Sequence, residues 1–156
     1  METIEQSIEV EAPLETVYNQ WTQFEEFPRF MSNVKEVRQL DDKRLHWKAS
    51  IAGKEKEWDA EIFKQEQDTR IAWRSTSGTP NAGEVRFDKG SGGKTRVTLA
   101  LSYDPEGVVE NVADALGVVS AQVRGDLERF KAFIEDRGRE TGAWRGEIQG
   151  GQVQGG

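Results

Sequence analysis

The stretch RLHWKASIAGKEKEWDAEIFKQ, from Arg44 to Gln65, alternates apolar side chains with charged ones on either side of an Ala-Gly pair. If Ala52 and Gly53 form a tight hairpin loop, in which the glycine supplies the positive φ that such a turn needs, Trp47 lies directly opposite Trp58. Successive side chains of a strand point to opposite faces, so one face of this hairpin is apolar and the other is nearly all polar. The pattern predicts an antiparallel sheet that is covered on one side.

The rest of the chain predicts an α+β fold around this hairpin. Alternation in TIEQSIEVEA indicates a first strand, and two apolar segments separated near Pro28 predict two short helices after it. Beyond Tyr103, Asp104 and Pro105 form an N-cap and first-turn pair, and apolar residues at intervals of three and four predict one long helix that reaches Ile134. We expect a seven-stranded antiparallel sheet around this long C-terminal helix, with the remaining strands near 34–40, 43–52, 54–66, 69–77, 83–89 and 94–103.

The length of 156 residues is that of one domain with a sizeable core. We assign residues 1–138 to this domain. Residues 139–156 contain many Gly and Gln residues and almost no apolar residue after Ile148, so we expect a C-terminal segment with a flexible tail. Trp144 either packs back on the domain or is exposed.

Composition excludes several classes of partner. The chain has no cysteine, which excludes disulfides and thiolate chemistry and suits a reducing compartment. Its 28 acidic and 21 basic residues give a net charge of -7, which repels phosphate backbones, so we expect no nucleic-acid partner. We see neither a targeting sequence nor an apolar run of about 18 residues, and we therefore expect a cytoplasmic protein without a transmembrane segment.

Two features that resemble metal or cofactor sites are better explained otherwise. His46 is the single histidine and falls on the polar face of the hairpin, so we expect an exposed structural residue. The run DKGSGGKT lacks a glycine at Asp88 and precedes a strand, whereas a phosphate-binding loop opens a helix. We expect no cofactor and no metal ion.

Several segments together resemble a known superfamily. They are APLETVYNQWTQFEEFPRFMSNV, the strand pair around Trp47 and Trp58, SGTPNAGEVRF, and DLERFKAFIEDRGRETGAWRGEI. In these residues and in its order of elements, the chain resembles the START-like (SRPBCC) superfamily of helix-grip proteins, whose bacterial members are labelled polyketide cyclase/dehydrase or coenzyme Q-binding START domain proteins. The resemblance covers about residues 1 to 148. It implies a cavity between sheet and helix for a hydrophobic ligand such as a lipid, an isoprenoid quinone or a polyketide-like aromatic compound.

Alternation along the strands and the apolar stripe of the helix give the candidate lining of this cavity. The same residues also suit a solid core, and both readings stay open for the tryptophans. The candidates are Trp47, Trp58, Ile62, Trp73, Ser75, Phe87, Leu99, Leu101, Tyr103, Val112, Leu116 and Val119.

The inward strand faces suggest binding without catalysis. They carry hydroxyl and indole donors but no carboxylate, His, Lys or Arg before the hairpin tip, so no acid-base pair is expected there. A bulge would shift one strand by a residue and bring in an ionisable group such as Arg74 or His46. The alternative is a cyclase or dehydratase that uses Tyr103 and Trp73 as donors. A second alternative is a protein-interaction module that uses the acidic surface or the tail.

Overall fold

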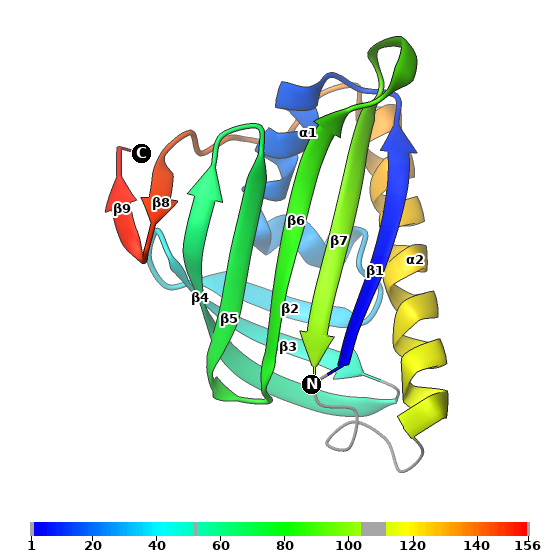
Figure 1. Cartoon of the computed structure of the whole chain (residues 1–156), viewed down its shortest axis with the longest axis vertical. Coiled ribbons are helices and arrows are strands. Elements are labelled where there is room, and N and C mark those ends of the chain that lie inside the picture. The colour runs from blue at the N-terminus through cyan, green and yellow to red at the C-terminus, as the bar shows by residue number, and fades with distance from the viewer. Residues whose placement is uncertain (1, 52, 104–111, 156) are drawn as a thin grey trace.

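A curved antiparallel sheet holds the helices of the protein on one face (Figure 1). The computed structural model describes residues 2–51, 53–103 and 112–155, with the side chains of 2, 51 and 112–116 left aside. The elements are β1 (Glu2–Val10), α1 (Leu14–Trp21), η1 (Phe24–Arg29), β2 (Val34–Gln39), β3 (Arg44–Ile51), β4 (Lys54–Glu66), β5 (Arg70–Gly78), β6 (Asn81–Lys89), η2 (Ser91–Gly93), β7 (Thr95–Tyr103), α2 (Val112–Arg137), β8 (Glu147–Gln149) and β9 (Gln152–Gln154).

The sheet has the order β1-β7-β6-β5-β4-β3-β2, and all of its ladders are antiparallel. Figure 1 shows that β2, β3 and the adjoining part of β4 run across the direction of β5, β6 and β7. This curvature makes one face concave, and α1, η1 and α2 lie on that face. The α+β helix-grip arrangement predicted from the sequence is confirmed.

The hairpin that decides the fold has the predicted register. Trp47 pairs with Trp58, and the ladder continues from Arg44↔Glu61 to Ile51↔Lys54. Gly53 has a φ of 83°, which is the left-handed conformation that a side chain disfavours. The turn therefore sets which residues of β3 and β4 share the apolar face.

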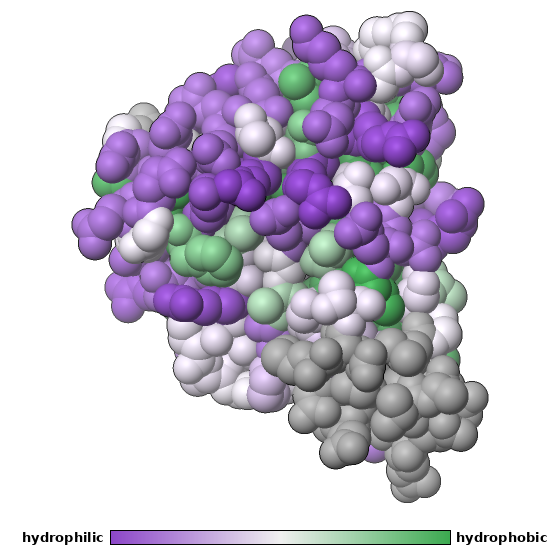
Figure 2. All heavy atoms as spheres, in the orientation of Figure 1, coloured by the Kyte–Doolittle hydropathy of each residue, from purple (hydrophilic) through white to green (hydrophobic). Residues whose placement is uncertain are grey.

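The two faces of the sheet differ in polarity. Figure 2 views the outer face, which is mostly hydrophilic. Inward residues of the same strands, such as Leu45, Ala60 and Val97, are at most 2% exposed. The sheet is thus covered on one side only, as the alternation predicted.

Two irregularities in the pairing of β4 with β5 correct the predicted inward face. The register shifts between Asp59 and Ala60 and again between Ile62 and Lys64. Ser77 consequently lies on the outer face, where its hydroxyl donates to Asp59 Oδ2 at 3.2 Å, whereas strict alternation with Trp73 and Ser75 along β5 would place it on the inner face. The second shift leaves Gln65 buried at 1% exposure.

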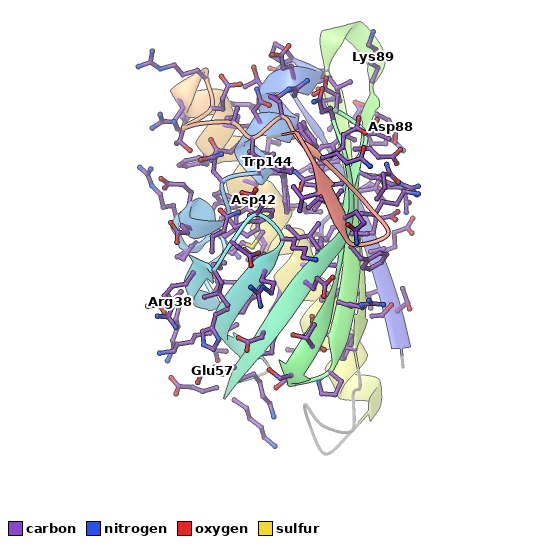
Figure 3. The ribbon with its side chains drawn as sticks, turned by 90° about the vertical axis from the view of Figure 1, so that its left-hand side faces the viewer. Arg38, Asp42, Glu57, Asp88, Lys89 and Trp144 are labelled. Carbon is purple, nitrogen blue, oxygen red and sulfur yellow. The ribbon has the colours of Figure 1, made fainter. Side chains whose placement is uncertain are left out.

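The segment that follows α2, which we call the closing segment (residues 138–155), adds two strands that were not predicted from the sequence. β8 pairs with β4 at Gln65↔Ile148 and with β9, so the sheet has nine strands and the predicted seven was too low. Ile148 is fully buried, and this single apolar residue anchors the strand. Trp144, marked in Figure 3, is half-buried and packs against the core.

Polar contacts tie this closing segment to α1. Arg145 donates two hydrogen bonds to the carboxylate of Asp68, at 2.7 and 2.9 Å, and a third to Asn19 Oδ1. Its guanidinium also lies over the ring of Tyr18, with Cζ 5.4 Å from the ring centroid. The segment after α2 therefore belongs to the packed body at least as far as β8.

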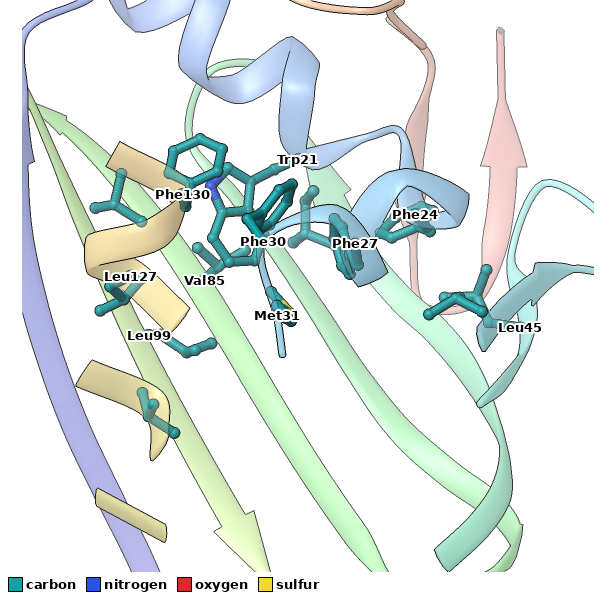
Figure 4. Packing of buried hydrophobic residues seen from close by; sticks show 14 of the residues in the cluster. Trp21, Phe24, Phe27, Phe30, Met31, Leu45, Val85, Leu99, Leu127 and Phe130 are labelled. Carbon is teal, nitrogen blue, oxygen red and sulfur yellow. The ribbon is translucent and has the colours of Figure 1, made fainter. Parts of the chain in front are cut away.

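An aromatic cluster fills the space between α1, η1 and the second half of α2 (Figure 4). Phe130 of α2 lies 5.2 Å from both Trp21 and Phe30, measured between ring centroids, and Trp21 lies 5.3 Å from Phe27. All four side chains are at most 3% exposed. We call this the closed end of the molecule. The predicted helix start at Asp104 and Pro105 lies outside the described residues, and α2 is described from Val112.

Candidate functional site

A cavity of about 140 Å³ lies between the first half of α2 and the sheet, next to the aromatic cluster. Trp47, Trp58 and Trp73 form the sheet side, while Val119 and Val123 form the helix side. Pro80, between β5 and β6, also lines the cavity and is exposed, so this side reaches the surface. We call this part of the molecule the cavity end.

The hairpin supplies a flat apolar wall. Trp47 and Trp58 are opposite each other in the ladder, and their rings stack with centroids 5.9 Å apart and planes inclined by only 6°. Cross-strand neighbours are close enough for such contact when both side chains are large. The two tryptophans in the charged hairpin thus form one continuous surface of the cavity.

A glycine positions the third tryptophan. Trp73 on β5 pairs with Gly83 on β6, and a Cβ placed on that glycine would lie 2.4 Å from Cζ2 of the indole. The ring therefore lies directly across the glycine backbone, where any larger residue would displace it. This explains the glycine within the SGTPNAGEVRF stretch and the orientation of Trp73 toward the cavity.

The volume of the side chains on α2 decides where the molecule is hollow. At the closed end the inward stripe of the helix carries Leu127, Phe130 and Ile134, which are at most 1% exposed. At the cavity end the same stripe carries Val119 and Val123, which reach less far toward the sheet. The cavity lies where these shorter side chains face the sheet.

Several indole donors around this space are unsatisfied. Trp21, Trp47 and Trp58 all line the cavity and are at most 9% exposed. Their Nε1 atoms are buried and have no hydrogen-bond acceptor among the residues that the structure describes. A buried N–H without an acceptor costs free energy, so these donors favour a ligand that carries acceptor atoms.

One ionisable side chain also lines the cavity. Asp126 of α2 accepts a hydrogen bond from Arg129 Nη2 at 2.6 Å, and the backbone N–H of Ser32 donates to it as well. Burial raises the pKa of the Asp126 carboxyl above its usual value, although the contacts with Arg129 and Ser32 act in the opposite direction. Arg129 Nε also donates to the carbonyl of Phe30 at 3.0 Å, which links α2 to the segment before β2.

The structure gathers many of the predicted residues around this cavity. Those that line it are Trp47, Trp58, Trp73, Leu99, Leu101, Tyr103 and Val119.

Three predicted residues do not line this cavity, which corrects the prediction of where they lie. Ile62 is fully buried and borders only a small void of about 10 Å³. Phe87 packs edge-on against Tyr18, with centroids 5.3 Å apart, in the solid core. Ser75 accepts a hydrogen bond from the backbone N–H of Asn81 at 3.0 Å beside the cavity. The side chains of the remaining two, Val112 and Leu116, lie outside the described residues.

The sequence analysis missed the polar residues of the wall. Gln122 and Asp126 line the cavity from α2, and Asn33, Thr79 and Asn81 line it from connecting segments and the start of β6. The two helix residues could have been predicted, because Gln122 and Asp126 have the spacing that places them on the same helical face as Val119 and Val123. Asn81 shares the inward parity of Val85 and Phe87 on β6, whereas Asn33 and Thr79 come from connecting segments whose side-chain direction alternation does not predict.

The histidine lies in a separate cluster on the outer face. On the paired strands β3 and β4, His46 Nδ1 is 2.5 Å from Asp59 Oδ1, and its Nε2 is 2.6 Å from Glu57 Oε1. Glu57 is labelled in Figure 3. Hydrogen bonding to Asp59, and then to Glu57, raises the pKa of His46 above its usual value. Within the described ranges, no group of three or more His, Asp or Glu side chains is arranged to hold a metal ion.

The fold and the cavity define the class of the protein. A long C-terminal helix held by a curved antiparallel sheet, with an apolar cavity between them, is the START-like helix-grip architecture. In the described part of the chain, no helix is long and apolar enough to cross a membrane.

Comparisons with known proteins agree with this class. Residues 10–132 match the family described as polyketide cyclase/dehydrase and lipid transport. A 17.2 kDa protein from the melC2-rnhH intergenic region of Streptomyces lincolnensis is 50% identical over 149 residues, which cover 95% of this chain and 99% of the relative. The chain therefore belongs to the polyketide cyclase/dehydrase and lipid transport family, a family with a fold that binds hydrophobic ligands.

Solved structures place the fold in the same group. A Deinococcus radiodurans protein is similar with a TM-score of 0.68 and 30% identity, covering 88% of this chain and 99% of that one. An aromatase/cyclase from Streptomyces sp. R1128 has a TM-score of 0.73 at 18% identity, covering 92% and 99%. A START superfamily protein from Mycobacterium smegmatis has a TM-score of 0.67 at 17% identity, covering 86% and 95%. At these last two identities the likeness concerns the fold alone.

Proposed function

We propose that this protein binds a small hydrophobic ring compound in the cavity and catalyses no reaction on it. The observation that carries the proposal is an apolar cavity bordered by three tryptophans whose buried N–H groups have no acceptor among the described residues. Ligand sites of this kind are mostly apolar and contain a few polar groups that orient the ligand. The ligand must therefore supply both apolar surface and an acceptor atom.

The size of the cavity limits the ligand. A cavity of roughly 150 Å³ in another protein holds benzene, so the enclosed 140 Å³ suits a single ring. A longer lipid or isoprenoid chain would have to extend past Pro80, where the cavity reaches the surface. A single-ring ligand needs no such extension and is the class that we favour.

Binding is testable through the tryptophans themselves. Tryptophan emission and melting temperature are followed while toluene, 1,4-benzoquinone, 1,4-naphthoquinone and decanoic acid are added in turn. A ligand that binds only the folded state stabilises it by about 2.7 kcal/mol at a concentration of 100 times Kd. We expect a response to at least one of the single-ring probes. A flat response to the whole panel would contradict the proposal.

A cavity-filling variant ties the response to this site. Val119→Phe places a ring in the cavity and should weaken probe binding at least about tenfold, or about 1.4 kcal/mol. Val118→Phe is the matched control, because Val118 lies on the same helix and is 41% exposed. Equal binding by both variants would place the probe elsewhere on the protein.

A second candidate function is catalysis, and Asp126 favours it. A carboxyl group with a raised pKa beside a ligand is suited to take or give a proton, as a cyclisation or dehydration requires. Incubation with a linear poly-β-ketone, followed by mass spectrometry of the products, separates the two candidates. Catalysis predicts faster product formation or an altered distribution of products, and Asp126→Asn should abolish the effect. Binding alone predicts the rate and the distribution of the protein-free reaction.

A further inference from the structure

We propose that Asp126 makes the cavity selective for phenols, that is, for uncharged rings whose hydroxyl donates a hydrogen bond to the carboxylate. This inference rests on the proposed binding function and names the ligand class within it. Asp126 is the acidic residue of the cavity lining, and it lies on the helix side, across from the tryptophans of the sheet.

The carboxylate has room for a donor from the ligand. A carboxylate accepts up to about four hydrogen bonds, and the structure assigns donors to Asp126 from Arg129 and from the Ser32 backbone. Arg129 approaches from outside, since its side chain is 44% exposed while that of Asp126 is 15% exposed. These two contacts hold the carboxylate in place and leave accepting capacity toward the cavity.

Burial strengthens the preference of the Asp126 carboxylate for a hydrogen-bond donor from the ligand. An incompletely hydrated carboxylate is unfavourable in an apolar site, and a hydroxyl donor restores part of what water supplies. Hydrogen bonds to an ionised acceptor are roughly twice as strong as those between neutral groups. A ring that carries a hydroxyl is therefore preferred over the same ring without one.

The indole donors favour the same chemistry from the sheet side. The N–H groups of Trp47 and Trp58 require acceptors, and a phenol oxygen donates one hydrogen bond while offering two lone pairs. A carboxylate ligand would also accept from the indoles, but its charge would be repelled by Asp126. An ammonium ligand would leave the indole N–H groups unsatisfied, because an ammonium group has no lone pair with which to accept from them.

Three probes of one shape separate these possibilities. The dissociation constants of p-cresol, 4-methylanisole and 4-methylbenzoate are measured with the full chain at pH 7 by tryptophan fluorescence and calorimetry. We expect p-cresol to bind at least about tenfold more tightly than 4-methylanisole, because its hydroxyl donates a hydrogen bond to a charged acceptor and the methyl ether has no such donor. We expect 4-methylbenzoate to bind most weakly.

Variants assign the preference to the carboxylate. Asp126→Asn keeps the shape and should reduce the preference for p-cresol to less than about threefold, while it strengthens binding of 4-methylbenzoate. Asp136→Asn is the control, since Asp136 lies on the same helix and is exposed. The comparison of probes on the unchanged chain needs no variant, so the inference stays testable even if Asp126→Asn does not fold.

The possible results distinguish a failure of phenol selectivity from a failure of ring binding itself. If p-cresol and 4-methylanisole bind equally well, the cavity binds rings and the inference is wrong. A preference for p-cresol that survives in Asp126→Asn, or tighter binding of 4-methylbenzoate than of p-cresol, also overturns it. If none of the probes binds, the proposed function for single rings fails, and the inference fails with it.

Discussion

The closed end and the cavity end are built from the same kinds of residue, yet one is solid and the other hollow. At the closed end, Trp21 lies against Phe130 of α2, with ring centroids 5.2 Å apart. At the cavity end, Trp58 stacks on Trp47, and the apolar side chains that the described part of α2 presents there are the valines Val119 and Val123. An apolar sheet face rich in tryptophan is therefore compatible with either outcome. The length of the helix side chains that face it decides between them.

The largest expected effect contrasts two leucines at the two ends. Leu127 is 1% exposed in the solid core, whereas Leu99 lines the cavity. Leu127→Ala removes contacts on all sides and should lower the free energy of unfolding by about 4 kcal/mol. Leu99→Ala should lower it by only about 2 kcal/mol, because the Leu99 side chain already borders the cavity and has fewer contacts to lose. Urea denaturation measures both. Equal losses would mean that the cavity end is as tightly packed as the closed end.

The second largest expected effect is a loss of stability on substitution of Arg145 in the closing segment, and this effect should be confined to the closed end. Arg145→Ala removes the paired hydrogen bonds to Asp68, the bond to Asn19 and the stacking on Tyr18, and should cost about 2 kcal/mol. Arg145→Lys keeps the charge without the planar, two-pronged geometry and should recover less than half of that loss. Affinity for a ring probe should stay unchanged in both, and a weakened affinity would show that the two ends are coupled.

Alkaline pH should destabilise the closed end through Tyr18. Burial raises the pKa of Tyr18 to about 12, although the hydrogen bond from Gln65 opposes this shift. Because the unfolded value is about 10, folding is favoured by the protonated phenol below pH 10, and up to about 2 kcal/mol of stability is lost as the pH rises toward 12. Urea midpoints between pH 9 and about 12 measure this slope. Tyr18→Phe should remove that part of it, and an unchanged slope would argue against a buried, protonated Tyr18.

The smallest expected effect concerns the outer face, away from both ends. The raised pKa of His46 means that its contribution to stability is complete below about pH 6.5 and is lost as the pH rises through the folded value. His46→Gln should remove this pH dependence and change stability by less than about 1 kcal/mol, as is usual for charged pairs near the surface. Thermal melts from pH 5 to about 9 test it, with probe affinity as a second readout that should not change.

Local rules predicted most of the sheet, because the turn and the alternation each depend on only a few neighbouring residues. The turn at Gly53 sets the pairing of Trp47 with Trp58, and alternation then assigns the faces. The same rules failed at Ser77, because an extra residue between Ser75 and Ser77 on β5 reverses the alternation without a signal in the sequence. They also missed β8, whose position depends on the burial of a single residue, Ile148, against a distant part of the sheet.

The candidate site was predicted on its sheet side and missed on its polar side. The indole wall followed from alternation, whereas Asp126 was assigned to no site although it has the helical spacing of Val119 and Val123. The prediction for that stripe used its apolar residues, and a carboxylate within such a stripe has no signature in the apolar periodicity. The segments that contribute Asn33 and Thr79 have no periodicity from which a direction can be inferred.

The sequence by itself determined the curved half-apolar sheet, the long helix that covers it and the family to which the chain belongs. These features depend on periodicity and turn chemistry, which are local. Only the tertiary structure decided that the space above Trp47, Trp58 and Trp73 is open and that Asp126 borders it. The physical reason is that a void depends on the combined reach of side chains from elements far apart in the chain, and no single segment contains that information.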